Sequence, residues 1–271
     1  MERIQSAIAK ARAARESGAE APHRHHQPLT DSGLAAIWSE LDEVPLRPRQ
    51  LEEARIIAHQ PGPGAAAYDL MRTNLLRHLR EHGWTRVAIS SPGSGCGKTT
   101  VCLNLAFSLA RQTDLRVLVL EMDLRRPAMS PMLGLTGKPN LAEVLEGKQT
   151  PERGLVRFGT NLAIGASTDP VPNPAELLSS AQAAATIDAI EARFKPDVIL
   201  CDLPPVLVTD DTLAFLDQVD CALLVAAAGH STVADIDRAG KELADNTRVL
   251  GVVLNKCRFV DRLDGYSDEN Y

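Results

Sequence analysis

A glycine-rich loop between an apolar strand and an apolar helix constrains this chain more than any other feature. The loop occupies residues 90–100 and reads Ser-Ser-Pro-Gly-Ser-Gly-Cys-Gly-Lys-Thr-Thr. Three glycines in five positions let the backbone curl so that successive N–H groups point at one anion. A strand, such a loop and a helix in succession indicate an α/β fold and a phosphate-binding loop, and a triphosphate is the ligand that it implies.

The loop supplies the first candidate binding residues. We expect Lys98 to reach the outer phosphates and the Thr99 hydroxyl to ligand Mg²⁺. Pro92 stands where the strict pattern has its first glycine, and Gly93 comes one residue late, so the loop is a variant. The predicted nucleotide contacts are Gly93, Ser94, Gly95, Cys96, Gly97, Lys98, Thr99 and Thr100.

The remainder of the chain alternates apolar strands with helical patterns. Strands are predicted at 86–91, 116–122, 161–166, 198–202, 221–227 and 249–255, and helices at 65–82, 98–111, 181–194 and 232–243. Continuous apolar strands separated by helices predict an α/β fold in which a parallel sheet carries helices on both faces. Ligands of such sheets bind at the carboxyl ends of the strands, which is where the loop falls.

The composition changes along the chain indicate three regions. Residues 1–64 are expected to hold an amphipathic N-terminal helix, a flexible linker and a short extension, and residues 65–258 the phosphate-loop domain. Residues 259–271 form a polar tail with two tyrosines, Tyr266 and Tyr271. We expect this tail to be mobile.

Charge and hydropathy exclude several classes of protein. A net charge of −6 and an aromatic content of 4% argue against a nucleic-acid-binding surface. No apolar run approaches the roughly 18 residues that a membrane helix needs, and the N-terminus has no apolar signal segment. The chain is therefore expected in the cytoplasm, with no transmembrane segment of its own.

Three carboxylates follow apolar strands and complete the candidate site. Asp202 ends the strand at 198–202 and is predicted to contact magnesium, the alternative being a capping or turn aspartate. Glu121 and Asp123 alternate along an extended segment, so both are expected to point to the same side. They could supply a water-mediated metal contact and a base for an incoming hydroxyl or water; the alternative is a strand-end turn.

These motifs together resemble the bacterial tyrosine kinase family, the cytoplasmic autokinases of capsule and exopolysaccharide synthesis. The resemblance rests on the loop before Lys98, the acidic segment that ends at Arg125, and the Asp-Leu-Pro-Pro segment at Asp202. It extends to the segments 68–75, 172–178 and 251–255, and covers about residues 55–257. It implies a fold of the septum-positioning and chromosome-partitioning (MinD/ParA-like) ATPases.

The resemblance also implies roles for individual residues. ATP would be held by Lys98 and Thr99, and magnesium contacted through Thr99 and Asp202. The catalytic set would be Lys98, Glu121, Asp123 and Arg125. Asn255 would contact the adenine, although an asparagine that caps the strand explains this position equally well.

The implied function is ATP-dependent tyrosine autophosphorylation that regulates polysaccharide synthesis and export. Tyr266 and Tyr271 would be the acceptors, and a separate membrane chain-length regulator would recruit and activate the chain at the inner face of the plasma membrane, with homo-oligomerisation open. The first acid of the paired segment is Glu121 where the family has aspartate, and Asp69 stands where the family has an arginine for subunit contacts. A non-kinase ATPase or nucleotide-dependent switch remains the alternative, and a noncatalytic interaction module is the third possibility.

Overall fold

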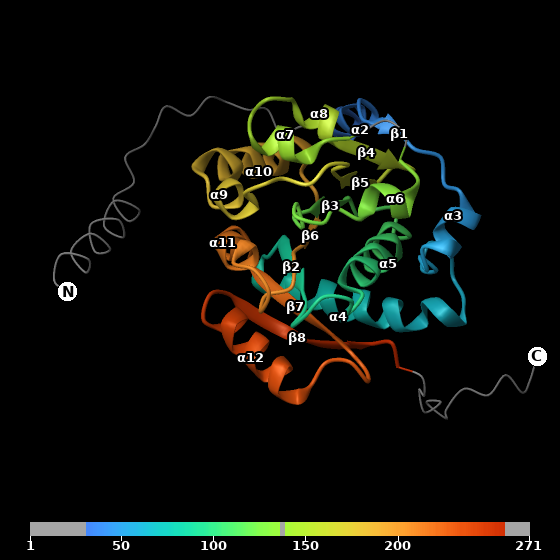
Figure 1. The fold of residues 1–271 in the computed structure, drawn as a ribbon. Coiled ribbons are helices and arrows are strands. Elements are labelled where there is room, and N and C mark those ends of the chain that lie inside the picture. The colour runs from blue at the N-terminus through green and yellow to red at the C-terminus, as the bar shows by residue number, and fades with distance from the viewer. Residues whose placement is uncertain (1–30, 136–138, 258–271) are drawn as a thin grey trace, which may run out of the picture. The chain divides into compact units, whose positions relative to one another are not determined.

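A computed structural model describes residues 31–135 and 139–257 (Figure 1). The described residues from Leu34 onward belong to one compact unit. The sequence placed the start of the domain at residue 65, but the structure includes residues 34–64 in that unit. Trp38 is 1% exposed, and its Nε1 donates a hydrogen bond to the Phe194 carbonyl at 2.8 Å. The segment folds with the domain because its few apolar side chains are buried in it.

An eight-stranded sheet forms the centre of the unit, in the order β1-β4-β5-β3-β6-β2-β7-β8. Among the described strand pairs, β4 and β5 are antiparallel and the others are parallel. The strands are β1 (Asp42–Glu43), β2 (Arg86–Ser90), β3 (Val117–Glu121), β4 (Leu155–Phe158), β5 (Leu162–Gly165), β6 (Val198–Asp202), β7 (Cys221–Ala227) and β8 (Arg248–Asn255).

Helices cover both faces of the sheet (Figure 1). One face packs against α3 (Pro48–Glu53), α4 (Ala66–His82), α5 (Lys98–Ala110) and α6 (Met129–Leu133). The other packs against α2 (Asp31–Ser39), α7 (Leu141–Leu145), α9 (Pro174–Leu178), α10 (Ala181–Phe194), α11 (Asp211–Phe215) and α12 (Val233–Ala244). The remaining short elements are α8 (Pro151–Gly154), η1 (Pro63–Ala65) and η2 (Leu216–Gln218).

The burial of the strands explains their continuous apolar sequences. In β3, Val117 and Val119 face the core under α5, whereas Leu118 and Leu120 face the core under α10. Successive side chains of a strand point to opposite faces, so a sheet that is covered on both sides needs an apolar residue at every position. The predicted fold class is thereby confirmed.

The helix α4 carries a local arrangement that its sequence alone did not indicate. Asp69 accepts hydrogen bonds from Arg111 Nη2 and Ser108 Oγ, both at 2.6 Å, and forms an ion pair with Arg72 at 3.2 Å. These contacts attach α4 to the adjacent α5, which starts at the phosphate loop. Asp69 and Arg72 therefore form an ion pair with each other within one subunit.

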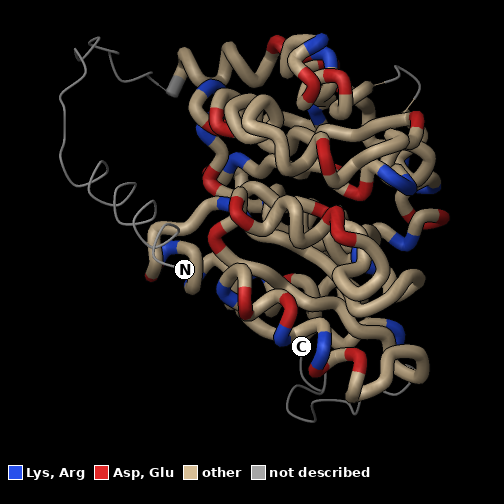
Figure 2. Tube along the Cα trace, turned by 60° about the vertical axis from the view of Figure 1, so that its left-hand side comes forward, with Lys and Arg blue, Asp and Glu red and all other residues tan. Residues whose placement is uncertain are grey.

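Charged residues of both signs are interspersed along the described part of the chain, as Figure 2 shows.

Candidate nucleotide site

The phosphate loop joins β2 to α5 at the carboxyl end of the sheet. Gly95 and Gly97 have φ angles of 77° and 85°, in the left-handed region that glycine adopts without strain. A Cβ on Gly97 would lie 2.4 Å from Asn255 Nδ2, so this position also excludes a side chain for want of space. Gly97 directly precedes α5, whose free N-terminal N–H groups favour an anion.

A cavity of about 290 Å³ lies over this loop. Eight of the residues predicted from the sequence line it: Ser94, Gly95, Gly97, Lys98, Thr99, Thr100, Asp123 and Arg125. Two other predicted loop residues, Gly93 and Cys96, line a neighbouring hollow instead. The Cys96 side chain is 1% exposed, and its Sγ lies 3.4 Å from Ser231 Oγ.

Four side chains from three strand ends meet at the floor of the cavity. Lys98 Nζ lies 2.7 Å from Asp123 Oδ2 and 3.8 Å from Asp202 Oδ1. The Thr99 hydroxyl donates to Asp202 Oδ2 at 2.7 Å. Burial lowers the pKa of Lys98, but the charges of Asp202 and Asp123 outweigh it and raise that pKa overall. Lys98 is thus a fixed positive charge in the site.

The oxygen atoms of the cluster fit a magnesium ion. Asp202 is 1% exposed, and its buried Oδ1 has no hydrogen-bond partner among the described residues. Burial raises the pKa of Asp202, and the Lys98 ammonium group 3.8 Å from Oδ1 compensates the charge of this oxygen without hydrogen-bonding to it, so a cation bound directly to Oδ1 would stabilise it further. The Thr99 hydroxyl next to it is the second oxygen ligand of the type that Mg²⁺ prefers.

Thr209 also belongs to this site, and the sequence did not single it out. It lines the cavity, and its Oγ1 is buried without a hydrogen-bond partner in the described part of the chain. A buried hydroxyl that faces a cavity is free to bond a ligand there. Its only signal in the sequence was its place just before the acidic pair Asp210 and Asp211.

The side chain of Glu121 does not point to the same side as that of Asp123, although the sequence had predicted that it would. It is fully buried, and its carboxylate accepts backbone N–H bonds from Ala128 at 2.6 Å, Met129 at 2.7 Å and Ser167 at 2.9 Å. Burial raises the pKa of Glu121 to about 7, against the opposite effect of these bonds. The alternation rule did not apply, because β3 ends at Glu121. The contacts indicate that Glu121 fixes the backbone that follows Asp123.

Arg125 lies at the rim of the cavity and is held by α11. Its Nε and Nη2 donate to the two carboxylate oxygens of Asp211 at 3.0 and 2.9 Å. Adjacent acidic residues such as Asp210 and Asp211 are candidates for capping a helix. Asp210 does precede α11 but makes no side-chain capping bond, whereas Asp211 is fully buried and orients Arg125.

Residues at or after the ends of β7 and β8 contact the carbonyl groups of the phosphate loop. Asn255 Nδ2 donates to the Cys96 carbonyl at 2.9 Å, and Lys256 Nζ donates to the Gly95 carbonyl at 2.6 Å. His230 Nε2 lies 3.2 Å from the Ser94 carbonyl oxygen. Lys256 and His230 were not among the predicted site residues, because contacts over more than 130 residues leave no local pattern.

The other sequence predictions lie outside this site. Tyr266, Tyr271 and the N-terminal helix fall outside the described residues. Within the described ranges, no helix has both the length and the apolar character needed to cross a membrane.

Known proteins resemble this chain in sequence and in fold. A family described as "CobQ/CobB/MinD/ParA nucleotide binding domain" matches residues 87–264. Tyrosine-protein kinase CpsD of Streptococcus pneumoniae serotype 4 is 32% identical over 173 residues, which cover 63% of this chain and 75% of that protein. The solved kinase domain of VpsO superimposes with a TM-score of 0.64 at 31% identity, covering 71% of this chain and 94% of that one.

Other relatives are much longer than this chain. Putative tyrosine-protein kinase EpsB of Ralstonia solanacearum is 31% identical over 195 residues, which cover 71% of this chain and 26% of that protein. The match therefore spans about a quarter of the length of that relative. Sequence and fold agree on the relationship: the chain belongs to the CobQ/CobB/MinD/ParA nucleotide-binding family and, within it, to the bacterial tyrosine kinases.

Proposed function

We propose that this chain is an ATP-dependent protein-tyrosine autokinase that regulates capsule or exopolysaccharide synthesis and export. The observation that carries the proposal is the cluster of Lys98, Thr99, Asp123 and Asp202 at the floor of a cavity over the phosphate loop. Each group has a task in phosphoryl transfer, which depends on positioning and on charge stabilisation more than on covalent chemistry. Relatives named as tyrosine kinases support the same reaction.

ATP binding would reorganise the ion pairs of this cluster. The loop N–H groups and Lys98 bind the phosphates, while Thr99 and Asp202 hold Mg²⁺, which would neutralise charge on the phosphate oxygens. Lys98 then exchanges its contact with Asp123 for one with a phosphate oxygen. Asn255, whose Nδ2 donates to the Cys96 carbonyl of the loop, is the proposed contact of the adenine base.

The released Asp123 would act as the general base. The tyrosine oxygen attacks the γ-phosphorus, the bond from that phosphorus to the bridging oxygen breaks, and ADP leaves with the bond electrons. The phenolic proton passes to the Asp123 carboxylate. Arg125, at the rim, is placed to stabilise the charge on the transferred group, and Glu121 holds the backbone from beneath.

The tail tyrosines are the proposed acceptors, and the activator is proposed to be a separate membrane chain-length regulator. Tyr266 and Tyr271 follow Asn255, the last residue of β8, by no more than 16 residues in the sequence. Asn255 itself lies beside the loop. Recruitment by such a partner would place the chain at the inner face of the plasma membrane. Residues 1–16 are the candidate docking element.

Mass spectrometry of the full chain after incubation with Mg-ATP tests this proposal. We expect phosphate on Tyr266 or Tyr271, its loss in Lys98→Met, and a large reduction in Asp123→Asn. The double variant Tyr266→Phe/Tyr271→Phe is the matched control, because it removes the acceptors and leaves the cavity intact. ADP release without phosphotyrosine, with and without the membrane regulator, would instead favour the ATPase or switch that remains the alternative.

A further inference from the structure

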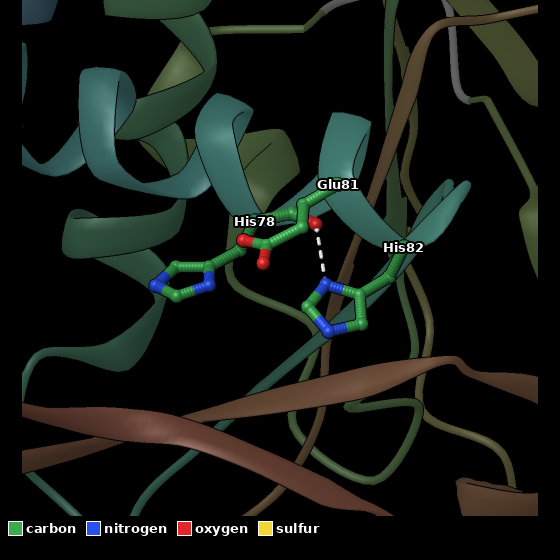
Figure 3. Close-up of side chains that lie close together, drawn as sticks. All are labelled: His78, Glu81 and His82. Atoms are coloured by element: carbon green, nitrogen blue, oxygen red, sulfur yellow. Dashed lines mark hydrogen bonds between the residues drawn. The ribbon is translucent and has the colours of Figure 1, made fainter.

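The last turns of α4 place three metal-binding side chains together, away from the nucleotide cavity (Figure 3). We propose that His78, Glu81 and His82 bind a divalent transition-metal ion of the zinc type. None of the three lines the cavity over the phosphate loop. The site is therefore separate from the one that serves phosphoryl transfer.

The spacing of the three residues brings their donor atoms to one face of the helix. Positions i, i+3 and i+4 of an α-helix are neighbours on its surface. One ligand atom from each of the three residues lies within 4.8 Å of the other two. Tetrahedral Zn²⁺ with bonds of about 2.0–2.1 Å needs donors about 3.3 Å apart. Glu81 and His82 are exposed and His78 is partly exposed, so small side-chain rotations can close the difference.

Contacts around His82 already orient its ring. Its Nδ1 lies 3.0 Å from the His78 carbonyl oxygen, an interaction drawn in Figure 3, and when Nδ1 donates there, Nε2 keeps its lone pair. A bond from one imidazole nitrogen to a backbone carbonyl is the usual way in which a metal-binding histidine is oriented. The His82 ring also stacks on Trp84, with centroids 4.2 Å apart and planes at 19°.

The local charge is mixed, because the helix end and Glu81 are negative, whereas Arg77 adjoins His78 and the Arg248 guanidinium lies 5.4 Å from the centroid of the Trp84 ring. α4 ends at His82, and the C-terminal end of a helix carries partial negative charge from its free carbonyl groups. Glu81 adds a full negative charge. Arg80, in the same turn, opposes this attraction, so its removal is expected to preserve or strengthen binding.

The donor set selects the kind of metal. Two imidazoles and one carboxylate suit Zn²⁺, Co²⁺, Ni²⁺ or Cu²⁺, whereas Mg²⁺ prefers the oxygen ligands that Thr99 and Asp202 offer. A bound ion would clamp the last turn of α4, which leads through residues 83–85 into β2 and the phosphate loop. Ion binding at this junction should therefore raise the melting temperature of the chain.

The test uses the full chain with His23, His25 and His26 replaced by alanine, because these histidines could bind metal independently. Zn²⁺ binding is measured by calorimetry and by the shift in Tm, with Mg²⁺ in excess, and Co²⁺ serves as a probe through its visible absorption. We expect one equivalent of Zn²⁺ to bind. His82→Phe keeps an aromatic ring on Trp84 and removes the ligand, and His78→Gln keeps the helix and removes the other imidazole.

Both ligand variants should retain the metal-free Tm and lose the Zn²⁺-dependent shift, with affinity reduced by more than the roughly 10–100-fold that loss of an outer partner costs. Arg80→Ala is the matched control from the same turn and should bind at least as tightly as the parent. Absence of stoichiometric Zn²⁺ binding in the parent, or equal binding by His82→Phe, His78→Gln and Arg80→Ala, would overturn the proposal.

Discussion

The buried carboxylate of Glu121 makes the stability of the fold depend on pH in a way that one substitution should remove. Burial raises its pKa from an ordinary 4.5 to about 7 in the folded chain. The folded state therefore binds this proton more tightly than the unfolded state does. The contribution of the group to stability is complete below pH 4.5 and is lost as the pH rises through 7.

The size of the effect follows from the two pKa values. Integrating the proton linkage between pH 5 and pH 8 gives a loss of about 2–3 kcal/mol of unfolding free energy from this one group. Glu121→Gln cannot titrate, so it should lack this part of the pH dependence. The variant still offers one carbonyl oxygen to Ala128 and Met129, but it leaves the Ser167 N–H facing an amide nitrogen, which costs about 1–3 kcal/mol.

Urea unfolding of both proteins at several pH values between 5 and 8 measures this difference. Titrating groups that do not interact with Glu121 are common to both chains and cancel in the subtraction, whereas Asp202 and Lys98, whose charges interact with that of Glu121, contribute a smaller part of the difference. We expect the unfolding free energy of the wild type minus that of the variant to fall by about 2–3 kcal/mol over this range. A difference that stays constant with pH would refute the reasoning, because Glu121 would then have the same pKa folded and unfolded.

Three further substitutions test other parts of the structure. Trp38→Ala should cost about 3–5 kcal/mol in urea unfolding, because the side chain is 1% exposed and belongs to the folded unit; a cost below about 1 kcal/mol would place it outside. Asp123→Asn should lower phosphoryl transfer by about 10²–10⁴-fold while nucleotide affinity, measured by titration with a fluorescent analogue, stays equal or rises. Weaker nucleotide binding would contradict the proposed exchange of partners by Lys98. Asn255→Ala should weaken nucleotide binding by up to about tenfold, the worth of one hydrogen bond, and unchanged affinity would show that the support of the Cys96 carbonyl is dispensable.

The sequence predicted the long elements well and the short ones poorly. The strands β2, β3, β5, β6, β7 and β8 were visible because each lies in a run of mostly apolar residues. β1 has two residues and the helices α6 to α9 have four or five each, which is too short for a period to be recognised. They form because longer elements hold them: β1 pairs with β4, and an ion pair joins Glu43 to Arg157.

The candidate site also has residues whose position could be predicted from the sequence and residues whose position could not. Lys98, Thr99, Asp123 and Asp202 could be placed together because β3, β6 and β2 are adjacent, and parallel strands bring their carboxyl ends to one edge. The direction of the Glu121 side chain could not be predicted, because it depends on N–H groups that a turn and a distant loop supply. The attachment of Arg125 to Asp211 spans 86 residues and likewise depends on tertiary structure.

The ion pair between Lys98 and Asp123 connects nucleotide binding to the availability of the Asp123 carboxylate. A carboxylate oxygen that contacts an ammonium group at 2.7 Å is occupied by that contact, so it is not free to approach the hydroxyl group of a tyrosine. The same ammonium group is the one expected to bind the phosphates. Nucleotide binding and release of the base are therefore one event in the proposed mechanism, and a tyrosine that arrives before ATP meets a carboxylate that is still engaged. The order of the two substrates would thus follow from a single lysine that can satisfy only one of its partners fully at a time.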